Sequence, residues 1–271
     1  MNALRGRRIA IIGAGKMGQA LIKGLLARGL SRRAVVAAES NAATRQAIRR
    51  RFRIAVTDDN VSAVRHADVV MLAVKPQQFR EVIGELAPHL RGKQLVISIA
   101  AGITLRWLEQ RLPRVPLIRV MPNLPATVGC GFAAVATGRR ATARHRAIAL
   151  AIFGAVGEVA ELPERSFDAM TAVSGSGPAY VLFLVQAWQE AARTLGLSDA
   201  VAHRAIQATL RGSVTLLEES REPAASLIAK VASKGGTTEA ALKQLARRRV
   251  AAHFAEALQA AAKRSKELAW S

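Results

Sequence analysis

A glycine-rich hexapeptide near the start of the chain has the composition and spacing of a phosphate-binding turn. Its sequence is Gly13-Ala14-Gly15-Lys16-Met17-Gly18, and it follows an apolar run that ends at Ile12. Between a strand and a helix, the first glycine permits a tight turn, the second lets the backbone approach a pyrophosphate, and the third lets the helix pack closely. The helix N-terminus then attracts the anion through its N–H groups and its dipole. The hexapeptide therefore predicts a dinucleotide site.

An acidic residue stands where the ribose of such a cofactor is recognised. Glu39 ends the next apolar run, roughly 20 residues beyond the glycines, where a carboxylate accepts hydrogen bonds from ribose hydroxyls and favours NAD. Ser40, Asn41 and Arg45 follow it and can instead hold a 2′-phosphate. The sequence therefore leaves the choice between NADH and NADPH open.

The elements that must position these residues follow from the apolar pattern. Up to about residue 160, short β-branched runs alternate with helical stretches, which is typical of a parallel sheet wound with helices. The predicted strands are residues 8–13, 34–38, 69–74, 95–100, 117–120, 132–136 and 158–162. The pattern predicts an α/β Rossmann domain with a doubly wound, mostly parallel sheet.

After Pro163 the β-branched runs disappear, and long segments rich in Ala, Leu, Gln, Glu and Arg continue to the end. The predicted helices are residues 178–195, 199–220, 222–232, 237–248 and 250–269. We therefore predict two domains, residues 1–162 and an all-helical domain of residues 163–271. Because these helices carry more apolar surface than five helices readily bury by themselves, we also predict a homodimer formed through the second domain.

The charge of the chain is unusual. Its 271 residues include 40 Lys and Arg against 19 Asp and Glu, a net charge of +21, which attracts phosphates, nucleic acid or anionic membranes. The basic residues form scattered clusters with no interleaved aromatics, so a solvated surface is favoured over a nucleic-acid interface. No apolar stretch reaches the roughly 18 residues of a membrane helix.

The cysteine and histidine content limits other chemistry. Cys130, the single cysteine, excludes an internal disulfide and a multi-cysteine metal site, which favours the cytoplasm; we predict that it is a small buried residue. The histidines lack a paired Ser, Cys or Asp pattern, so we predict structural or surface roles for them and no metal site. They are His66, His89, His145, His203 and His253.

Five further segments carry specific motifs. They are Ala73-Val74-Lys75-Pro76-Gln77, Ser98-Ile99-Ala100-Ala101-Gly102, Arg119-Val120-Met121-Pro122-Asn123, Val173-Ser174-Gly175-Ser176-Gly177-Pro178-Ala179-Tyr180 and Ser233-Lys234-Gly235-Gly236-Thr237-Thr238. With the hexapeptide, they make the chain resemble the pyrroline-5-carboxylate reductase family over essentially its whole length.

The resemblance implies an NAD(P)H-dependent oxidoreductase that reduces 1-pyrroline-5-carboxylate to L-proline, the last step of proline biosynthesis, by hydride transfer to the cyclic imine. It also implies an intertwined dimer, often assembled into a ring of dimers, in which a partner subunit helps to complete the active site. The expected cofactor contacts are Ile12, Gly13, Ala14, Gly15, Lys16, Met17, Gly18, Glu39, Ser40, Asn60, Ala73, Val74, Lys75, Ala100 and Ala101. Without the resemblance, Lys75 reads as a surface lysine at a strand end.

The second glycine-rich turn suits the substrate of this family. The N–H groups and helix dipole around Gly235 and Gly236 can receive its carboxylate, and the Thr238 hydroxyl can bind the imine nitrogen and relay a proton. A pre-protonated iminium needs no donor, and a plain loop with a threonine N-cap is the simpler alternative. We predict Thr238 as the catalytic residue and Ser176, Ser233, Gly235, Gly236, Thr237 and Thr238 as substrate-binding. Ser174 and Ser176 can also be simple N-caps.

Lys234 departs from the family motif, which usually has proline at this place. Loss of proline frees the backbone of the loop, whereas a lysine adds a cation beside the carboxylate. One alternative function is a related imine or β-hydroxyacid reductase, although the catalytic lysine of the hydroxyacid enzymes is missing from residues 178–195. The other is a non-catalytic protein that binds nucleotides or nucleic acid.

Overall fold

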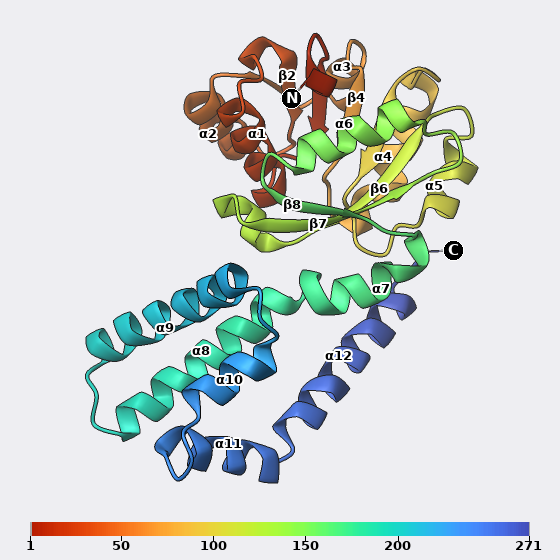
Figure 1. Cartoon of the computed structure of the whole chain (residues 1–271). Helices are drawn as coiled ribbons and strands as arrows, with labels where there is room; N and C mark the ends of the chain where they lie inside the picture. The colour runs from red at the N-terminus through yellow and green to blue at the C-terminus, as the bar shows by residue number, and fades with distance from the viewer. Residues whose placement is uncertain (1, 271) are drawn as a thin grey trace. The chain divides into compact units, whose positions relative to one another are not determined.

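The computed structural model describes residues 2–270 (Figure 1). They pack as two units, residues 2–176 together with 261–270, and residues 177–260. The predicted boundary after residue 162 follows the end of the last strand, whereas packing divides the chain after Ser176. The elements in between are the short helical turn η6 (Glu164–Ser166), the helix α7 (Phe167–Met170) and the π-helical turn η7 (Thr171–Gly175). They belong to the first unit because the Phe167 side chain is buried in its core.

A single twisted sheet forms the centre of the first unit. Its strands are β1 (Ile9–Ile12), β2 (Val35–Ala38), β3 (Ala55–Thr57), β4 (Val69–Leu72), β5 (Leu95–Ser98), β6 (Leu117–Pro122), β7 (Gly131–Thr137) and β8 (Gly157–Glu161). Their order is β3-β2-β1-β4-β5-β6-β7-β8. Neighbouring strands are parallel except β6 and β7. The predicted Rossmann-type, mostly parallel sheet is confirmed.

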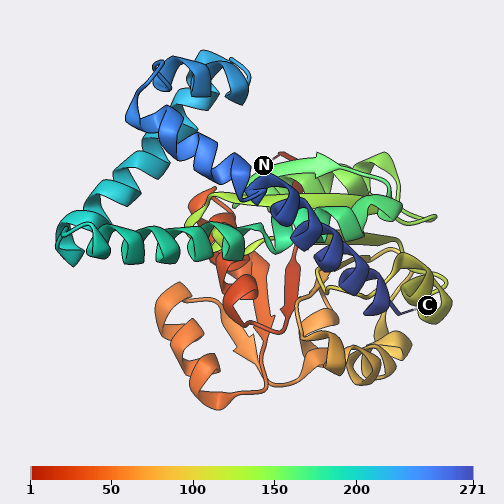
Figure 2. The ribbon, with the colours of Figure 1, turned by 90° about the horizontal axis from the view of Figure 1, so that it is seen from below.

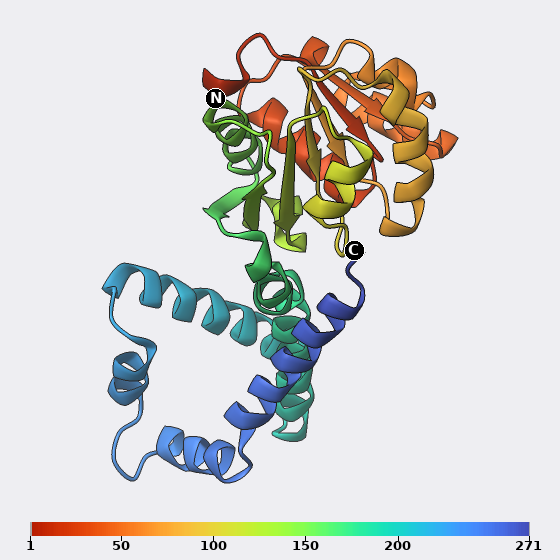
Figure 3. The ribbon, with the colours of Figure 1, turned by 90° about the vertical axis from the view of Figure 1, so that its right-hand side faces the viewer.

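Helices cover both faces of this sheet, as Figures 1 and 3 show. They are α1 (Lys16–Ala27), α2 (Ala42–Phe52), α3 (Asn60–Val64), α4 (Phe79–Leu86), α5 (Leu105–Arg111) and α6 (Ala143–Phe153). Alternate residues of β1 enter separate cores: Ile11 packs in a cluster with residues of α1, α2 and α6, and Ile12 in a cluster with residues of α3, α4 and α5. Burial on both faces explains why the strands are continuous apolar runs.

The second unit consists of helices alone. They are α8 (Gly177–Thr194), α9 (Asp199–Ser220), α10 (Ala224–Val231), α11 (Thr237–Arg247) and the first part of α12 (Val250–Glu267). Only Ala192, Ala202 and Ile206 are buried in it, and Figures 2 and 3 show an open series of helices rather than a closed bundle. The predicted all-helical character is confirmed.

The last residues of the chain return to the first unit. The Trp270 N–H donates to the Gly102 oxygen at 2.7 Å, and the Thr104 hydroxyl donates to the Trp270 oxygen at 2.7 Å. The Trp270 ring meets Trp107 edge to face, with centroids 5.3 Å apart. The C-terminus therefore holds the segment that follows β5. Among residues 2–270, no helix combines the length and the apolar character needed to cross a membrane.

The prediction of a buried Cys130 is wrong. This side chain is exposed, and its thiol lies 3.9 Å from the Val128 oxygen. The cause is local, because Gly129 adopts a left-handed φ of 82° and turns the chain just before β7.

Candidate active site

The hexapeptide forms the turn between β1 and α1. Gly13 has a φ of 86°, and a Cβ atom there would lie 2.8 Å from the Val74 nitrogen. A Cβ atom on Gly18 would lie 2.6 Å from the Gly13 oxygen, so the third glycine lets α1 approach the turn. A Cβ atom on Gly15 would meet no atom within 4 Å. The first and third glycines therefore serve packing, whereas the second leaves an open face.

The start of α1 leaves hydrogen-bond donors at this open face. Gly15 is the N-cap and supplies no side chain to the helix. Lys16, Met17 and Gly18, the first three helical residues, consequently have N–H groups without an intrahelical partner. Unpaired donors, a positive helix end and an absent Cβ together fit the pyrophosphate of a dinucleotide.

Glu39 is fixed beside the turn at the end of β2. One carboxylate oxygen accepts from the Ala14 N–H at 3.1 Å, and the other accepts from the Asn41 N–H at 3.0 Å. Arg45 donates to the carbonyl oxygens of Glu39 and Ser40 and forms an ion pair with Asp58 at 2.9 Å. The carboxylate is therefore held against the turn between β1 and α1, and Arg45 is already engaged with three acceptors.

The other predicted cofactor residues follow the carboxyl ends of neighbouring strands. Ala73 donates its N–H to the Ile12 oxygen at 2.7 Å, and the next residue, Val74, contacts Gly13. Lys75 is exposed after β4, Ala100 is buried and Ala101 exposed after β5, Ser40 is exposed after β2, and Asn60 begins α3 and donates to Glu85 at 2.8 Å. The structure thus arranges these predicted residues along one edge of the sheet, around the switch point between β1 and β4.

The second glycine-rich turn lies in the other unit, before α11. The Gly235 N–H donates to a Glu239 carboxylate oxygen at 2.6 Å, and the Gly236 N–H donates to the Ser233 oxygen at 3.0 Å. Both glycine donors that we expected to receive a carboxylate therefore have partners within the turn. The donors left are the N–H groups of the first turn of α11, at Thr237, Thr238 and Glu239, because the N-cap residue Gly236 provides no side-chain bond.

Glu239 also lies at this turn, and sequence reasoning did not single it out. Its ion pair with Lys243 (2.9 Å) and its hydrogen bond from Gly235 lower the pKa of this carboxyl below its usual value. The sequence did carry a signal, since a glutamate at the third helical position commonly reaches back over the N-cap. Thr238 is half-buried, whereas Ser233, Lys234 and Thr237 are exposed.

Ser174 is not a helix cap. It accepts a hydrogen bond from the Asn123 amide at 3.1 Å, and Asn123 in turn accepts from the Phe132 N–H at 2.9 Å. The Ser176 N–H donates to the Thr171 oxygen at 2.8 Å and closes the π-helical turn. The two bonds of Asn123 tie Ser174 to β7 through the segment that follows β6. Among the described residues, no group of His, Cys, Asp or Glu is arranged to hold a metal ion.

The comparisons with known proteins cover both units. Residues 164–268 match the family described as pyrroline-5-carboxylate reductase dimerisation, and residues 8–102 match the family described as NADP oxidoreductase, coenzyme F420-dependent. The chain is 42% identical to a pyrroline-5-carboxylate reductase of Pseudomonas aeruginosa, over 97% of each chain. It is 38% identical to that of Synechocystis, over 96% of this chain and 98% of the relative.

Solved structures give the same result. The pyrroline-5-carboxylate reductase of Coxiella burnetii superposes with a TM-score of 0.91 at 33% identity, covering 98% of this chain and 99% of that one. The Plasmodium falciparum pyrroline carboxylate reductase, solved with NADP bound, superposes with a TM-score of 0.88 at 26% identity, with the same coverage.

Proposed function

The chain belongs to the pyrroline-5-carboxylate reductase family, and we propose that two glycine-rich turns carry its reaction. The protein is an NAD(P)H-dependent oxidoreductase that reduces 1-pyrroline-5-carboxylate to L-proline. When bound, the nicotinamide cofactor supplies the hydride that reduces the C=N bond. The task of the chain is to hold both reactants in a reactive orientation, which contributes several kcal/mol in such reactions.

The hexapeptide holds the dinucleotide. The N–H groups of Lys16, Met17 and Gly18 bind the pyrophosphate across the open face of Gly15, and the Glu39 carboxylate receives the ribose hydroxyls. The observation that carries this proposal is the contrast between Gly15 and Gly13. An added Cβ meets no atom within 4 Å at Gly15, whereas at Gly13 it meets Ala73 and Val74, which follow β4. Space at the second glycine is what an approaching phosphate requires.

The start of α11 holds the imine substrate. Its carboxylate accepts from the first-turn N–H groups of Thr237 and Thr238. The Thr238 hydroxyl hydrogen-bonds the ring nitrogen, donates the proton that this nitrogen gains, and takes up a proton from solvent in its place. Glu239 is an anion close to this place, and its ion pair with Lys243 and its bond from Gly235 reduce its repulsion of the substrate.

Thr238→Ala tests the substrate site, with Thr237→Ala as the matched control on the neighbouring, exposed residue. Loss of a hydrogen bond to a charged reacting group should lower kcat/KM by roughly 10- to 100-fold. Coenzyme affinity, measured by calorimetry, should be unchanged in both variants. If Thr238→Ala keeps wild-type kcat and KM, the proposed role of this hydroxyl is refuted.

We also propose that two copies of the chain form a homodimer through the second unit. Large apolar side chains such as Phe183 (73% exposed) and Val231 (64% exposed) are open to solvent in one copy of the chain. The Tyr180 hydroxyl is shielded from solvent but has no hydrogen-bond partner among the described residues. A second copy would cover these apolar faces, and a ring of dimers is the further assembly that we propose. The single exposed cysteine keeps the cytoplasm as the proposed compartment.

Phe183→Glu tests the dimer, with Val128→Glu as the control, since Val128 is equally open (70% exposed) but lies in the first unit. Light scattering should detect a dimer or a multiple of it in the wild type and control, and a smaller species in Phe183→Glu. A wild type that is a stable, active monomer at micromolar concentration would contradict the proposal.

A further inference from the structure

A basic hollow of the first unit lies away from the hexapeptide. It has a volume of about 540 Å³ and is lined by residues that precede β1, end α1 and lead into β2. Because β1 and β2 are parallel, their amino ends share one edge of the sheet and the hexapeptide lies at the opposite edge. This hollow is therefore separate from the dinucleotide site.

The lining of the hollow is strongly basic. It contains five arginines and no acidic residue, and the other lining residues are uncharged. The arginines are Arg5, Arg7, Arg8, Arg28 and Arg33. Within residues 2–270, none of them forms an ion pair. A group of unpaired guanidinium groups around a concave surface creates a local positive potential that attracts anions.

The positive potential extends beyond the hollow. Arg8 also lines an adjoining hollow of about 290 Å³, whose other charged residues include Arg65, Arg91 and Lys93. Its single acid, Asp68, accepts a hydrogen bond from the Arg8 N–H at 2.8 Å. His145 lies in α6, which packs against the short helical turn of residues Asn2–Leu4, and its pKa is lowered by burial and by the charges of Arg7 and Arg144. Part of the net positive charge is therefore concentrated at the edge formed by the amino ends of β1 and β2. The reductase activity does not require positive charge at this edge.

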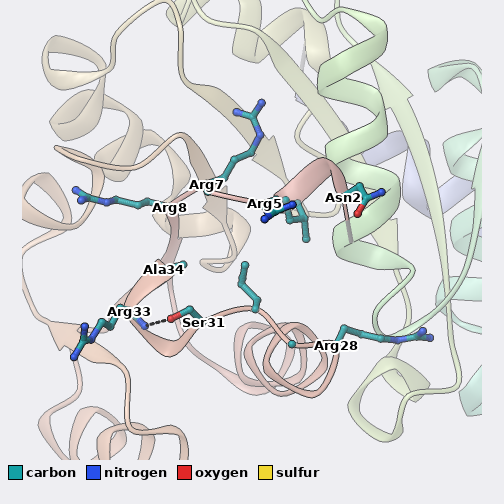
Figure 4. Close-up of a pocket in the computed structure, with 12 residues that line it drawn as sticks. Asn2, Arg5, Arg7, Arg8, Arg28, Ser31, Arg33 and Ala34 are labelled. Atoms are coloured by element: carbon teal, nitrogen blue, oxygen red, sulfur yellow. Dashed lines mark hydrogen bonds between the residues drawn. The ribbon is translucent and has the colours of Figure 1, made fainter.

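The arrangement of the arginines indicates the kind of anion. In Figure 4 the Arg5 side chain lies near the centre, while Arg8 and Arg33 extend to one side and Arg28 to the other. The guanidinium groups are spread around the hollow and do not converge on one point. A single small anion would meet one or two of them, whereas a chain of linked phosphates would meet more.

We propose that this arginine-lined hollow binds a small ligand with linked phosphates, either a polyphosphate chain or a nucleoside triphosphate. Its volume lies in the range of small-molecule sites, and each arginine offers the planar, bidentate donors that suit phosphate oxygens. The site is independent of the hydride-transfer site, so its occupation and the reductase activity are separable by mutation.

Arg5 and Arg33 are the residues to substitute. Arg7 donates to the Ala3 oxygen, and Arg28 follows the negative end of α1, so both also serve the fold. The side chains of Arg5 and Arg33 make no hydrogen bond within residues 2–270. The test variant is R5Q/R33Q. The control is R247Q/R248Q, which removes the same charge from exposed residues of the second unit.

The experiment is calorimetric titration of the full chain with tripolyphosphate, in the presence of saturating NADP⁺ so that the dinucleotide site is filled. We expect one tripolyphosphate per chain, and an affinity at least about tenfold lower in R5Q/R33Q but within about twofold of wild type in the control. Orthophosphate should bind much more weakly. ATP that binds more tightly than tripolyphosphate would identify a nucleotide ligand, and equal affinities would identify the phosphate chain alone.

Three results would overturn the proposal. The first is no binding of tripolyphosphate at low ionic strength. The second is an equal loss of affinity in both double variants, which would mean attraction by the overall charge. The third is binding of a DNA duplex that R5Q/R33Q weakens while tripolyphosphate does not bind, which would assign this edge to nucleic acid.

Discussion

Separate substitution of Gly13 and Gly15 should distinguish folding from coenzyme binding within the hexapeptide. Gly13 has a left-handed φ of 86°, and an alanine Cβ there would lie 2.8 Å from the Val74 nitrogen and 2.9 Å from the Ala73 carbonyl carbon. Left-handed backbone costs an L-residue about 1–2 kcal/mol, and overpacking costs a further 1–3 kcal/mol or so, which gives a total of about 2–5 kcal/mol. Gly13→Ala should lower the free energy of unfolding by this amount. The Val74 Cγ1 atom, at 2.7 Å, also clashes with the added Cβ, but the other two clashing atoms belong to the backbone and cannot move aside cheaply.

Gly15→Val should leave the free energy of unfolding nearly unchanged and abolish coenzyme binding. An added Cβ meets no atom within 4 Å, and the φ of −67° is accessible to every residue. The free energy of unfolding should change by no more than about 1 kcal/mol, the usual effect of a poorer N-cap. Coenzyme binding should be lost, because the branched side chain fills the face across which the pyrophosphate approaches.

Urea unfolding and calorimetric titration with NADPH measure the two effects on the same samples. Gly13→Ala with wild-type stability would refute the steric reasoning at the first glycine. Gly15→Val with wild-type NADPH affinity would refute the assignment of the hexapeptide to the cofactor.

Three further predictions concern single side chains. Glu39→Ser should shift kcat/KM toward NADPH relative to NADH by about 1 kcal/mol or more, because the carboxylate repels a 2′-phosphate; an unchanged ratio would place Glu39 away from the adenosine end. Glu164→Ala should destabilise the protein by about 3 kcal/mol, because it removes the partner of Arg119 (2.8 Å), which is only 6% exposed; Glu164→Gln, which keeps an acceptor, should cost less in urea unfolding. Burial and two neighbouring arginines lower the pKa of His145, so the folded state binds this proton more weakly than the unfolded state. The stability from this residue should therefore fall as pH drops through about 6.5 toward the folded pKa, and a melting-temperature series should be less pH-dependent for His145→Gln.

The elements of the sheet were predictable because their signals are local. Strands such as β4 and β5 are buried on both faces and therefore read as uninterrupted apolar runs. The hexapeptide was also predictable, since the positive φ of Gly13 and the close approach at Gly18 depend on residues within one turn. The strand β3 was missed because it has only the three residues Ala-Val-Thr, and none of them is fully buried.

Contacts between distant parts of the chain were not predictable. The docking of Trp270 on Gly102 and Thr104 joins residues about 170 positions apart, and neither partner belongs to a periodic pattern. The Asn123–Ser174 hydrogen bond likewise replaces the local N-cap that the sequence suggested for this serine. In both cases a polar group found its partner through the tertiary fold, and local propensity carried no information about that choice.

The Glu239–Gly235 hydrogen bond explains how the turn can stay restricted although Lys234 stands where the family usually has proline. A proline would restrict this turn covalently, whereas here a 2.6 Å hydrogen bond from the Gly235 N–H to the Glu239 carboxylate restricts it. If the hydrogen bond takes over the role of the ring, Glu239→Ala should raise KM for the imine by roughly threefold or more with Lys234 present, and by less in the Lys234→Pro background. Glu239→Gln, which keeps an acceptor but no charge, controls for the repulsion between this carboxylate and the substrate.

Steady-state kinetics of this double-mutant cycle at low and physiological ionic strength separates preorganisation from charge. One outcome is that Lys234→Pro leaves kcat/KM unchanged or better and also reduces the effect of Glu239→Ala. That result would mean that the proline ring and the Glu239–Gly235 hydrogen bond substitute for each other. A KM that rises in Lys234→Pro and loses its salt dependence would mean that the lysine acts as a cation toward the substrate carboxylate. Equal effects of Glu239→Ala in both backgrounds would refute the coupling, because independent devices give additive changes.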